Sequence, residues 1–316
     1  MRIAIFGAGG AGGYFGAQLA NAGEDVIFIA RGEHLEAIRS CGLRVETPTG
    51  KLLIQPAQAS DDPAQVGICD VVIVGVKTWQ VTDAAHSMRS MVGSKTLVVP
   101  FQNGVEAPSQ LAAVLGADQV LGGLCGTISY IVGPGRIRSV GEMHFVRFGE
   151  LNKHMSERVE RLRQVFRRAG VKVDVPADIE VAMWEKFLFV VPFGGVGAVT
   201  RAPIGVTRAL PETRRMLEQG MCEILALARA RRVALSDEVI PTTLAMIDTL
   251  PPNATASLQR DIVDGKPSEL EAWNGAVVRL GREMTIATPP HAFIYHSLLA
   301  LESQARGIVQ FPDGSP

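Results

Sequence analysis

The stretch that decides the fold is Ile3-Ala4-Ile5-Phe6-Gly7-Ala8-Gly9-Gly10-Ala11-Gly12-Gly13-Tyr14-Phe15-Gly16. An apolar, β-prone run is followed by a glycine turn, and apolar residues then recur at helical spacing. A strand, a glycine turn and a helix in this order are typical of a dinucleotide site. Gly7 would allow the tight turn, Gly9 would let the backbone approach a pyrophosphate, and Gly12 would let the helix lie close to the strand.

The N–H groups and the dipole at the start of this helix favour a phosphate group. The alternative is a purely structural glycine turn, which the flanking strand and helix disfavour. We therefore predict that the cofactor is bound by Gly7, Ala8, Gly9, Gly10, Ala11 and Gly12.

The end of the second strand indicates which nucleotide is bound. An NAD site places a carboxylate there to bind the ribose 2′-OH. The predicted strand over 26–30 ends instead at Arg31, whereas Glu24 and Asp25 precede it. A guanidinium is suited to a 2′-phosphate, so the sequence favours NADP. The alternative is a solvated arginine that opens the next helix.

The composition indicates a cytoplasmic enzyme without a nucleic-acid or membrane partner. Over 316 residues, 31 Lys and Arg nearly balance 32 Asp and Glu, so no charge excess points to such partners. Cys41, Cys69, Cys125 and Cys222 are widely spaced, which predicts reduced, mostly buried thiols. The six histidines show no ligand spacing, so no metal is expected. A homodimer is left open.

The pattern of elements predicts an α/β chain of two domains. Residues 1–175 alternate short β-rich runs with helices, which indicates a doubly wound, Rossmann-type sheet with an antiparallel extension over 128–148. Residues 176–306 show only helical patterns, at 178–191, 212–232, 236–249, 255–263, 269–284 and 290–305. Residues 307–316 are expected to be a disordered tail.

Two local patterns refine the second domain. The apolar run over 187–199 contains Pro192 and glycines and is too short to span a bilayer, so we expect it in the core. Ser268 and Glu271 have the spacing of a capping box, which predicts that a helix starts there.

Two strand ends in the first domain carry candidate site residues. Strands predicted over 70–76 and 96–100 are followed by Lys77 and by Asn103. Ligands of open α/β sheets lie beyond the carboxyl ends of the strands, so both side chains should lie beside the nicotinamide. The alternatives are a surface lysine at a helix start and an ordinary Asn-Gly turn.

Lys186 is the strongest chemical candidate in the second domain. On a helix its neighbours at three and four residues are all apolar: Ala182, Met183, Phe189 and Val190. Burial lowers the pKa of a lysine towards the value that a general acid needs near neutrality. The alternative is a lysine whose stem packs while its ammonium reaches water.

A set of motifs along nearly the whole chain resembles the ketopantoate reductase (2-dehydropantoate 2-reductase) family. In order, these are the glycine turn, Arg31, Val76-Lys77-Thr78-Trp79, Gln102-Asn103-Gly104, Trp184-Glu185-Lys186, Ser257-Leu258-Gln259-Arg260-Asp261 and Glu269. The resemblance implies a Rossmann domain and an all-helical domain like the C-terminal domain of 6-phosphogluconate dehydrogenase. It also implies the NADPH-dependent reduction of ketopantoate to pantoate, a step of pantothenate and coenzyme A biosynthesis.

The resemblance also implies roles for single residues. Lys186 would be the catalytic lysine and Glu269 its acidic partner. Lys77 and Asn103 would lie near the nicotinamide and the substrate, and Ser257 would contact the substrate carboxylate. Glu269 has a simpler explanation, because the helix dipole stabilises a carboxylate in the first turn of a helix.

Three positions depart from the family pattern and leave the substrate open. Val190, Gly194 and Ala254 stand where the family has asparagines, with Asn253 one residue out of register. Apolar groups there would bind the ketopantoate hydroxyl poorly. A reductase of a more apolar 2-oxo acid is therefore one alternative, and an NADP-binding sensor without turnover is another. The sensor is disfavoured because cofactor binding requires neither Lys186 nor Glu269.

Overall fold

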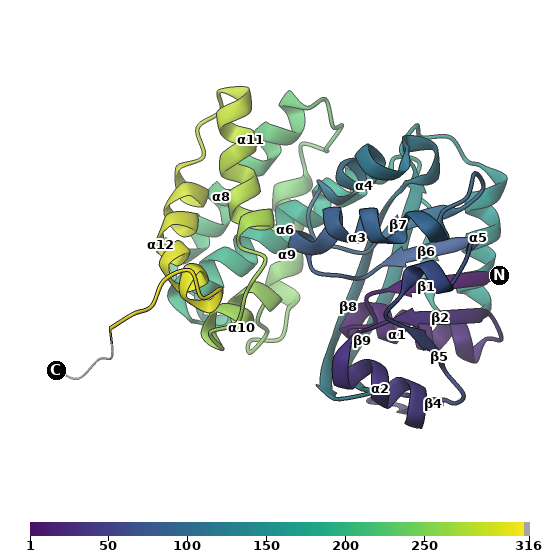
Figure 1. The fold of residues 1–316 in the computed structure, drawn as a ribbon. Helices are drawn as coiled ribbons and strands as arrows, with labels where there is room; N and C mark the ends of the chain where they lie inside the picture. The colour runs from purple at the N-terminus through teal and green to yellow at the C-terminus, as the bar shows by residue number, and fades with distance from the viewer. Residues whose placement is uncertain (313–316) are drawn as a thin grey trace. The chain divides into compact units, whose positions relative to one another are not determined.

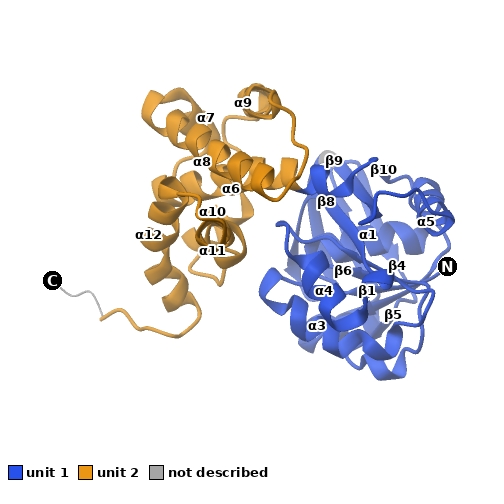
Figure 2. Cartoon of the chain, turned by 90° about the horizontal axis from the view of Figure 1, so that it is seen from above, with its two compact units in different colours: residues 1–183 blue, residues 184–316 orange. Residues whose placement is uncertain are grey.

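The computed structural model describes residues 1–312, apart from the side chains of residues 142 and 143. The chain divides into two compact units, Met1–Met183 and Trp184–Pro316 (Figure 1, Figure 2). The sequence pattern places this boundary earlier, at residue 175. Part of the expected tail, residues 313–316, lies outside the described residues.

Unit 1 is built on a parallel sheet, which confirms the predicted α/β class. Its five strands run in the order β5-β2-β1-β6-β7, and every neighbouring pair is parallel. The strands are β1 (Arg2–Phe6), β2 (Asp25–Ile29), β5 (Gln58–Ser60), β6 (Val71–Val74) and β7 (Leu97–Pro100). β1 lies between β2 and β6, so the turn that follows β1 is at the point where the strand order reverses.

Alternate residues of these strands feed two separate cores. Ile3 and Ile5 pack on one face with α1 (Gly10–Asn21), α2 (Gly32–Cys41) and α5 (Glu157–Arg168). Ala4 and Phe6 pack on the other face with α3 (Val81–Ser87) and α4 (Ala107–Leu115). Both faces of the sheet are therefore covered, which explains why its strands are almost uniformly apolar.

The antiparallel extension that the sequence predicts over 128–148 is present as part of a second sheet. β8 (Leu121–Gly133) and β9 (Arg136–Glu150) form a long antiparallel ribbon. β9 also pairs with β3 (Leu43–Thr47) and β10 (Lys172–Asp174), and β3 pairs with β4 (Gly50–Ile54). A single bridge, from Val98 to Val120, links the ribbon to β7. The predicted antiparallel extension is therefore confirmed in β8 and β9, whereas their sheet neighbours β3 and β4 were not predicted, because their half-exposed positions carry a weak apolar signal.

Unit 2 is all-helical within its described residues, as predicted. After α6 (Ile179–Thr200), which begins in unit 1, it contains α7 (Ile204–Ala209), α8 (Pro211–Ala230), α9 (Val239–Thr249), α10 (Ser257–Val263), the π-helical turn η5 (Glu271–Gly275), α11 (Ala276–Met284) and α12 (Pro289–Ala305). Figure 2 shows these helices around α6.

Helix α6 continues past the point where the sequence predicts its end. Pro192 lies inside the helix, which runs on to Thr200. Proline removes one helical hydrogen bond, but Val191 and Val196 on either side are fully buried, so tertiary packing holds the segment. α6 is long and apolar enough to cross a membrane, yet 72% of its apolar window is buried within the protein. This burial matches the expected core position.

Two further expectations are corrected. Cys41 and Cys222 are exposed and only Cys69 and Cys125 are buried, so the thiols are not mostly buried, although all four are free. The capping box is not formed, because the Ser268 N–H donates to Glu302 at 3.1 Å. Glu271 instead accepts from Arg279 at 2.7 Å. The Ser268 N–H therefore binds the buried Glu302, which is distant in the sequence, in place of the nearby Glu271.

Candidate active site

The glycine turn after β1 is compact where it meets the sheet and open where a phosphate would lie. Gly7 has a φ of +102°, and a Cβ there would lie 2.8 Å from the Val76 nitrogen. A Cβ on Gly12 would lie 2.2 Å from the Gly7 oxygen. A Cβ on Gly9, in contrast, would meet nothing within 4 Å. The turn thus requires glycine for its own packing at two positions and leaves free space at the third.

The start of α1 has the donors that a pyrophosphate needs. Gly9 is the N-cap, and its carbonyl accepts from the Gly13 N–H at 2.8 Å. The N–H groups in the first turn of a helix have no acceptor within that helix. The first turn of α1, all of it described, has no acidic side chain. These residues therefore fit the phosphate groups of a dinucleotide.

His34 holds the glycine turn to the ribbon, a contact that the sequence did not reveal. The Gly135 N–H donates to Nδ1 of His34 at 3.1 Å, so the proton of a neutral imidazole is on Nε2. Nε2 lies 2.9 Å from the Ala8 carbonyl oxygen, to which it donates. His34, which lies on α2, thereby connects the turn after β1 with the turn between β8 and β9.

A cluster of hydroxyls on the ribbon borders the same turn and was also missed. A Cβ on Gly10 would lie 2.0 Å from the Ser129 carbonyl oxygen, so α1 starts directly on β8. The hydroxyl of Ser129 contacts those of Thr127 at 2.6 Å and Ser139 at 2.7 Å. Thr127 also contacts Nδ1 of His144 at 3.2 Å, and burial lowers the pKa of His144. The lowered pKa keeps this imidazole neutral near pH 7.

Arg31 stands where the sequence places it, at the end of β2. It is the N-cap of α2 and is exposed. Glu24 pairs with Arg168 at 2.8 Å, and Asp25 accepts from Gln58 at 2.8 Å. Because β2 begins at Asp25, both carboxylates lie at the opposite end of the strand from Arg31.

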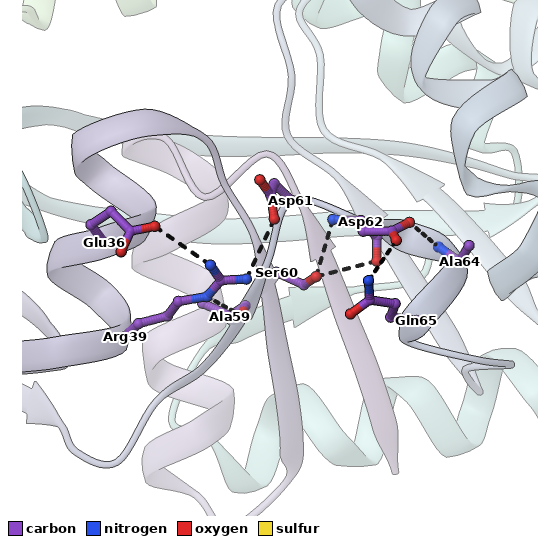
Figure 3. A network of polar contacts seen from close by, with 8 residues as sticks. All are labelled: Glu36, Arg39, Ala59, Ser60, Asp61, Asp62, Ala64 and Gln65. Carbon is purple, nitrogen blue, oxygen red and sulfur yellow. Dashed lines mark hydrogen bonds and ion pairs between the residues drawn. The ribbon is translucent and has the colours of Figure 1, made fainter.

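The neighbouring strand β5 brings two carboxylates to the same edge of the sheet (Figure 3). The Ala30 N–H donates to the Ser60 carbonyl, so Asp61 and Asp62 follow β5 beside the end of β2. Asp61 lies 3.4 Å from Arg39. Asp62 accepts from the Ala64 N–H at 2.9 Å and caps a short helix, η1 (Pro63–Gln65). Both acids therefore have partners within the protein.

Lys77 and Asn103 follow adjacent strands, as the sequence predicts. Val74 of β6 is paired with Pro100 of β7, so the two strands end at the same level. Lys77 caps a short helix, η2 (Thr78–Gln80), and its Nζ lies 5.7 Å from the centre of the Trp79 ring. Asn103 is half-buried. The structure thus brings both residues to the sheet edge that carries the glycine turn.

In unit 2, Lys186 lies on α6 among apolar side chains. It is half-buried, and the adjacent Phe187 and Leu188 are fully buried. Val190 and Gly194 follow at four and eight residues, so the three positions share one face of the helix.

Gly194 meets the other elements that carry predicted site residues. A Cβ there would lie 2.7 Å from Cζ3 of Trp273 and 3.4 Å from Cβ of Ala256. Ala256 is the N-cap of α10, which begins with the half-buried Ser257. Trp273 lies in η5, and its backbone N–H donates to the Glu269 carbonyl at 3.0 Å. The face of α6 that carries Lys186 therefore packs against the segments that carry Ser257 and Glu269.

Trp273 itself could not be predicted from spacing. Its indole is 1% exposed and occupies the space beside Gly194. Within the described residues, the indole Nε1 has no hydrogen-bond partner. Where the family pattern has an asparagine, this protein therefore places an aromatic ring.

Glu269 is buried, whereas the carboxylate two residues later lies at the surface. Glu269 is 8% exposed and directly precedes η5. Glu271 accepts from the Tyr295 hydroxyl at 2.6 Å. Burial and this carboxylate raise the pKa of Tyr295 to about 12. π-helical turns occur often at functional sites, and this one follows a predicted site residue.

Among the side chains that the structure describes, no group of three or more His, Cys, Asp or Glu could hold a metal ion. The buried His291 pairs with Glu223 at 2.5 Å. His291 and Glu223 thus form a buried pair in the core of unit 2.

Comparison with known proteins gives the same family in both units. Residues 3–153 match the model described as ketopantoate reductase PanE/ApbA, and residues 178–302 match that of its C-terminal domain. The uncharacterized oxidoreductase YkpB of Bacillus subtilis is 27% identical over 96% of this chain and 100% of its own. The 2-dehydropantoate 2-reductase of Mesorhizobium japonicum is 31% identical over 92% of this chain and 94% of its own.

Solved structures share the fold over nearly the full length. A PanE/ApbA family ketopantoate reductase from Ralstonia eutropha has a TM-score of 0.89 at 30% identity, covering 97% of this chain and 100% of its own. D-mandelate dehydrogenase, solved with NADH and anilino(oxo)acetate, also has a TM-score of 0.89 with the same coverage. At 20% identity, the second likeness shows the fold alone.

Proposed function

Because the chain belongs to the ketopantoate reductase family, an oxidoreductase family, we propose that it reduces a 2-oxo acid with NADPH. Ketopantoate, reduced to pantoate, is the first candidate substrate. The observation that carries this proposal is the glycine turn, which leaves free space at Gly9 beside the first N–H groups of α1. The cytoplasmic location and the homodimer stay predictions.

We assign cofactor binding to the glycine turn and the strand ends beside it. The N–H groups at the start of α1 would bind the pyrophosphate, and Arg31 would bind the 2′-phosphate of NADP. Lys77 and Asn103 would bind near the nicotinamide and the substrate. When bound, the cofactor supplies the hydride, so the protein has to supply orientation and a proton.

Lys186 is assigned as the proton donor. Its ammonium would polarise the substrate carbonyl and give a proton to the oxygen as negative charge develops there. The buried Ala182 and Met183, one turn before it, would lower the local dielectric and so strengthen this interaction. Glu269 would orient the ammonium and keep it charged, and the Ser257 hydroxyl would bind the substrate carboxylate.

A second candidate substrate is a 2-oxo acid without the ketopantoate hydroxyl. Trp273 occupies the space beside Gly194, and Val190 lies one turn before it on the same face. Neither residue 190 nor residue 194 has a side chain that can hydrogen-bond a substrate hydroxyl. A buried hydroxyl without a partner costs about 1–3 kcal/mol, so these residues favour an apolar side chain on the substrate.

The test is the oxidation of NADPH by the purified protein in the presence of single 2-oxo acids, with wild type and Lys186→Ala compared. General acid catalysis contributes about two to four decades, so kcat should fall by that amount in the variant. The Kd of NADPH should be unchanged. Lys172→Ala, which removes an exposed lysine of β10, is the control and should retain full turnover.

Three results would contradict the assignment. An unchanged kcat in Lys186→Ala, or loss of folding in that variant, would show that the lysine is structural. Tight NADPH binding by the wild type without reduction of any 2-oxo acid would favour the sensor instead.

A further inference from the structure

Gln102, which directly precedes Asn103, joins the ends of β6 and β7 through its side chain. It is 6% exposed. Its Nε2 donates to the Val74 carbonyl at 3.0 Å and to the Val76 carbonyl at 2.9 Å. Both acceptors belong to the segment that leads from β6 into Lys77. One carboxamide therefore spans the last residue of a strand and the turn that follows it.

The orientation of this carboxamide follows from its partners. Both neighbours of Nε2 are carbonyl oxygens, and only a nitrogen can donate to them. The opposite atom, Oε1, is buried and has no hydrogen-bond partner within the described residues. A buried polar atom without a partner destabilises the fold. Within the described residues, the Gln102 carboxamide thus makes only the two hydrogen bonds to the end of β6.

The segment that Gln102 holds is the one on which the glycine turn rests. A Cβ on Gly75 would lie 2.9 Å from the Gly7 oxygen, and a Cβ on Gly7 would lie 2.8 Å from the Val76 nitrogen. The Gly75 N–H also donates to the Phe6 carbonyl at 2.8 Å. A shift of residues 74–76 would therefore be transmitted to the turn after β1 as well as to Lys77.

We propose that Gln102 is a positioning residue of the cofactor site. Its carboxamide fixes the end of β6 relative to the end of β7, and so sets the places of Lys77, Asn103 and the glycine turn at once. The proposal rests on the proposed function, because it takes these three features as the cofactor site. Gln102 itself need not touch the cofactor.

The same two strands offer a matched control at their opposite ends. Thr96 precedes β7, is 1% exposed, and donates from Oγ1 to the Cys69 carbonyl at 2.7 Å. Cys69 precedes β6. Thr96 therefore ties β6 to β7 by a side-chain bond of the same kind, but at the amino ends of the strands, away from the predicted site.

The experiment compares Gln102→Met with Thr96→Val in the full-length protein. Each variant keeps the approximate volume and removes the side-chain hydrogen bonds. Both should lower Tm by a few degrees. Gln102→Met should also raise the Kd of NADPH, from a fluorescence titration, and its KM by about tenfold, whereas Thr96→Val should leave both within about twofold of wild type. Gln102→Leu, of similar size and also without a donor, should behave as Gln102→Met does.

The outcomes separate this proposal from the proposed function. If both Gln102 variants bind NADPH as tightly as Thr96→Val does, Gln102 is only a structural residue and the proposal is wrong. If one of them fails to fold, the other decides. If the wild type binds NADPH but reduces no 2-oxo acid, the proposed reaction fails while the Kd comparison still tests Gln102. If the wild type binds neither NADPH nor NADH, both proposals are overturned.

Discussion

At the scale of single residues, the nucleotide preference depends on charges at one edge of the sheet. Arg31 at the end of β2 is exposed, whereas Asp61 beside it is paired with Arg39. Asp62 is engaged by the backbone of η1. The Arg31 guanidinium is thus available to a 2′-phosphate. The two carboxylates that would repel that phosphate have partners of their own. This arrangement supports NADPH over NADH.

We predict that Arg31→Ala weakens the binding of NADPH by about ten- to hundredfold, the value of hydrogen bonds to a charged group. The affinity for NADH should barely change, because NADH has no 2′-phosphate. The measurement is the Kd of each cofactor for wild type and variant.

Arg44→Ala is the control for this prediction. It removes the same charge from an exposed position of β3 in the second sheet, and it leaves Asp61 paired with Arg39. Its effect on NADPH should therefore be small. Equal affinity of the wild type for both cofactors would contradict the assignment of Arg31.

At the scale of elements, α6 combines a predicted catalytic lysine with a close contact at Gly194. A Cβ at residue 194 would lie 2.7 Å from Cζ3 of Trp273, an atom that is part of a rigid ring. Alanine favours a helix over glycine by about 1 kcal/mol. Overpacking of a core costs about 1–3 kcal/mol. The steric clash should therefore outweigh the helix preference and decide the sign of the change in the free energy of unfolding.

Gly194→Ala should therefore lower the free energy of unfolding, although the same change stabilises an unconstrained helix. Denaturant unfolding of Gly194→Ala, Trp273→Leu and the double variant gives the coupling between the two positions. In the Trp273→Leu background, the alanine should cost nothing or stabilise. An equal loss in both backgrounds would show that the indole is not the obstacle.

The elements that the sequence predicted well are those with strong periodic signals. The buried runs of β1, β6 and β7 and the long helices of unit 2 were predicted from apolar spacing alone. The short strands β3, β4 and β5 were missed because they are half-exposed. β3 and β4 form a local hairpin, but β3 joins its sheet through the distant β9 and β5 pairs with the distant β2. The end of α6 at Pro192 was wrong because tertiary packing outweighed the helix-breaking tendency of proline.

The candidate site shows the same division. The glycine turn, Arg31, Lys77, Asn103 and Lys186 belong to local motifs, and their positions on the elements could be predicted. The bonds of His34 and Gln102 and the place of Trp273 could not. Each depends on a contact between residues that are far apart in the sequence, and their residue types alone carry no signal of it.

At the scale of the whole molecule, the family match spans both units, but it does not fix the substrate. A fold hosts many substrates, and the side chains of the site select among them. In the proposed site that selection would depend on Val190 and on the pair of Gly194 and Trp273. Of the two positions on α6, only residue 190 can accept an asparagine, because the ring of Trp273 fills the space beside residue 194.

We therefore predict that the wild type reduces the deoxy analogue of ketopantoate at least as well as ketopantoate itself. Val190→Asn should shift kcat/KM towards ketopantoate by about one to two decades, the value of one buried hydrogen bond to a substrate hydroxyl. The measurement is kcat/KM for both acids with both proteins. Val263→Asn, at an exposed position of α10, is the control and should leave the ratio unchanged.

If the wild type already prefers ketopantoate by roughly a thousandfold, another residue binds the hydroxyl. The exposed Asn253, which lies before α10, is then the next to substitute, and the chain is a reductase of ketopantoate itself.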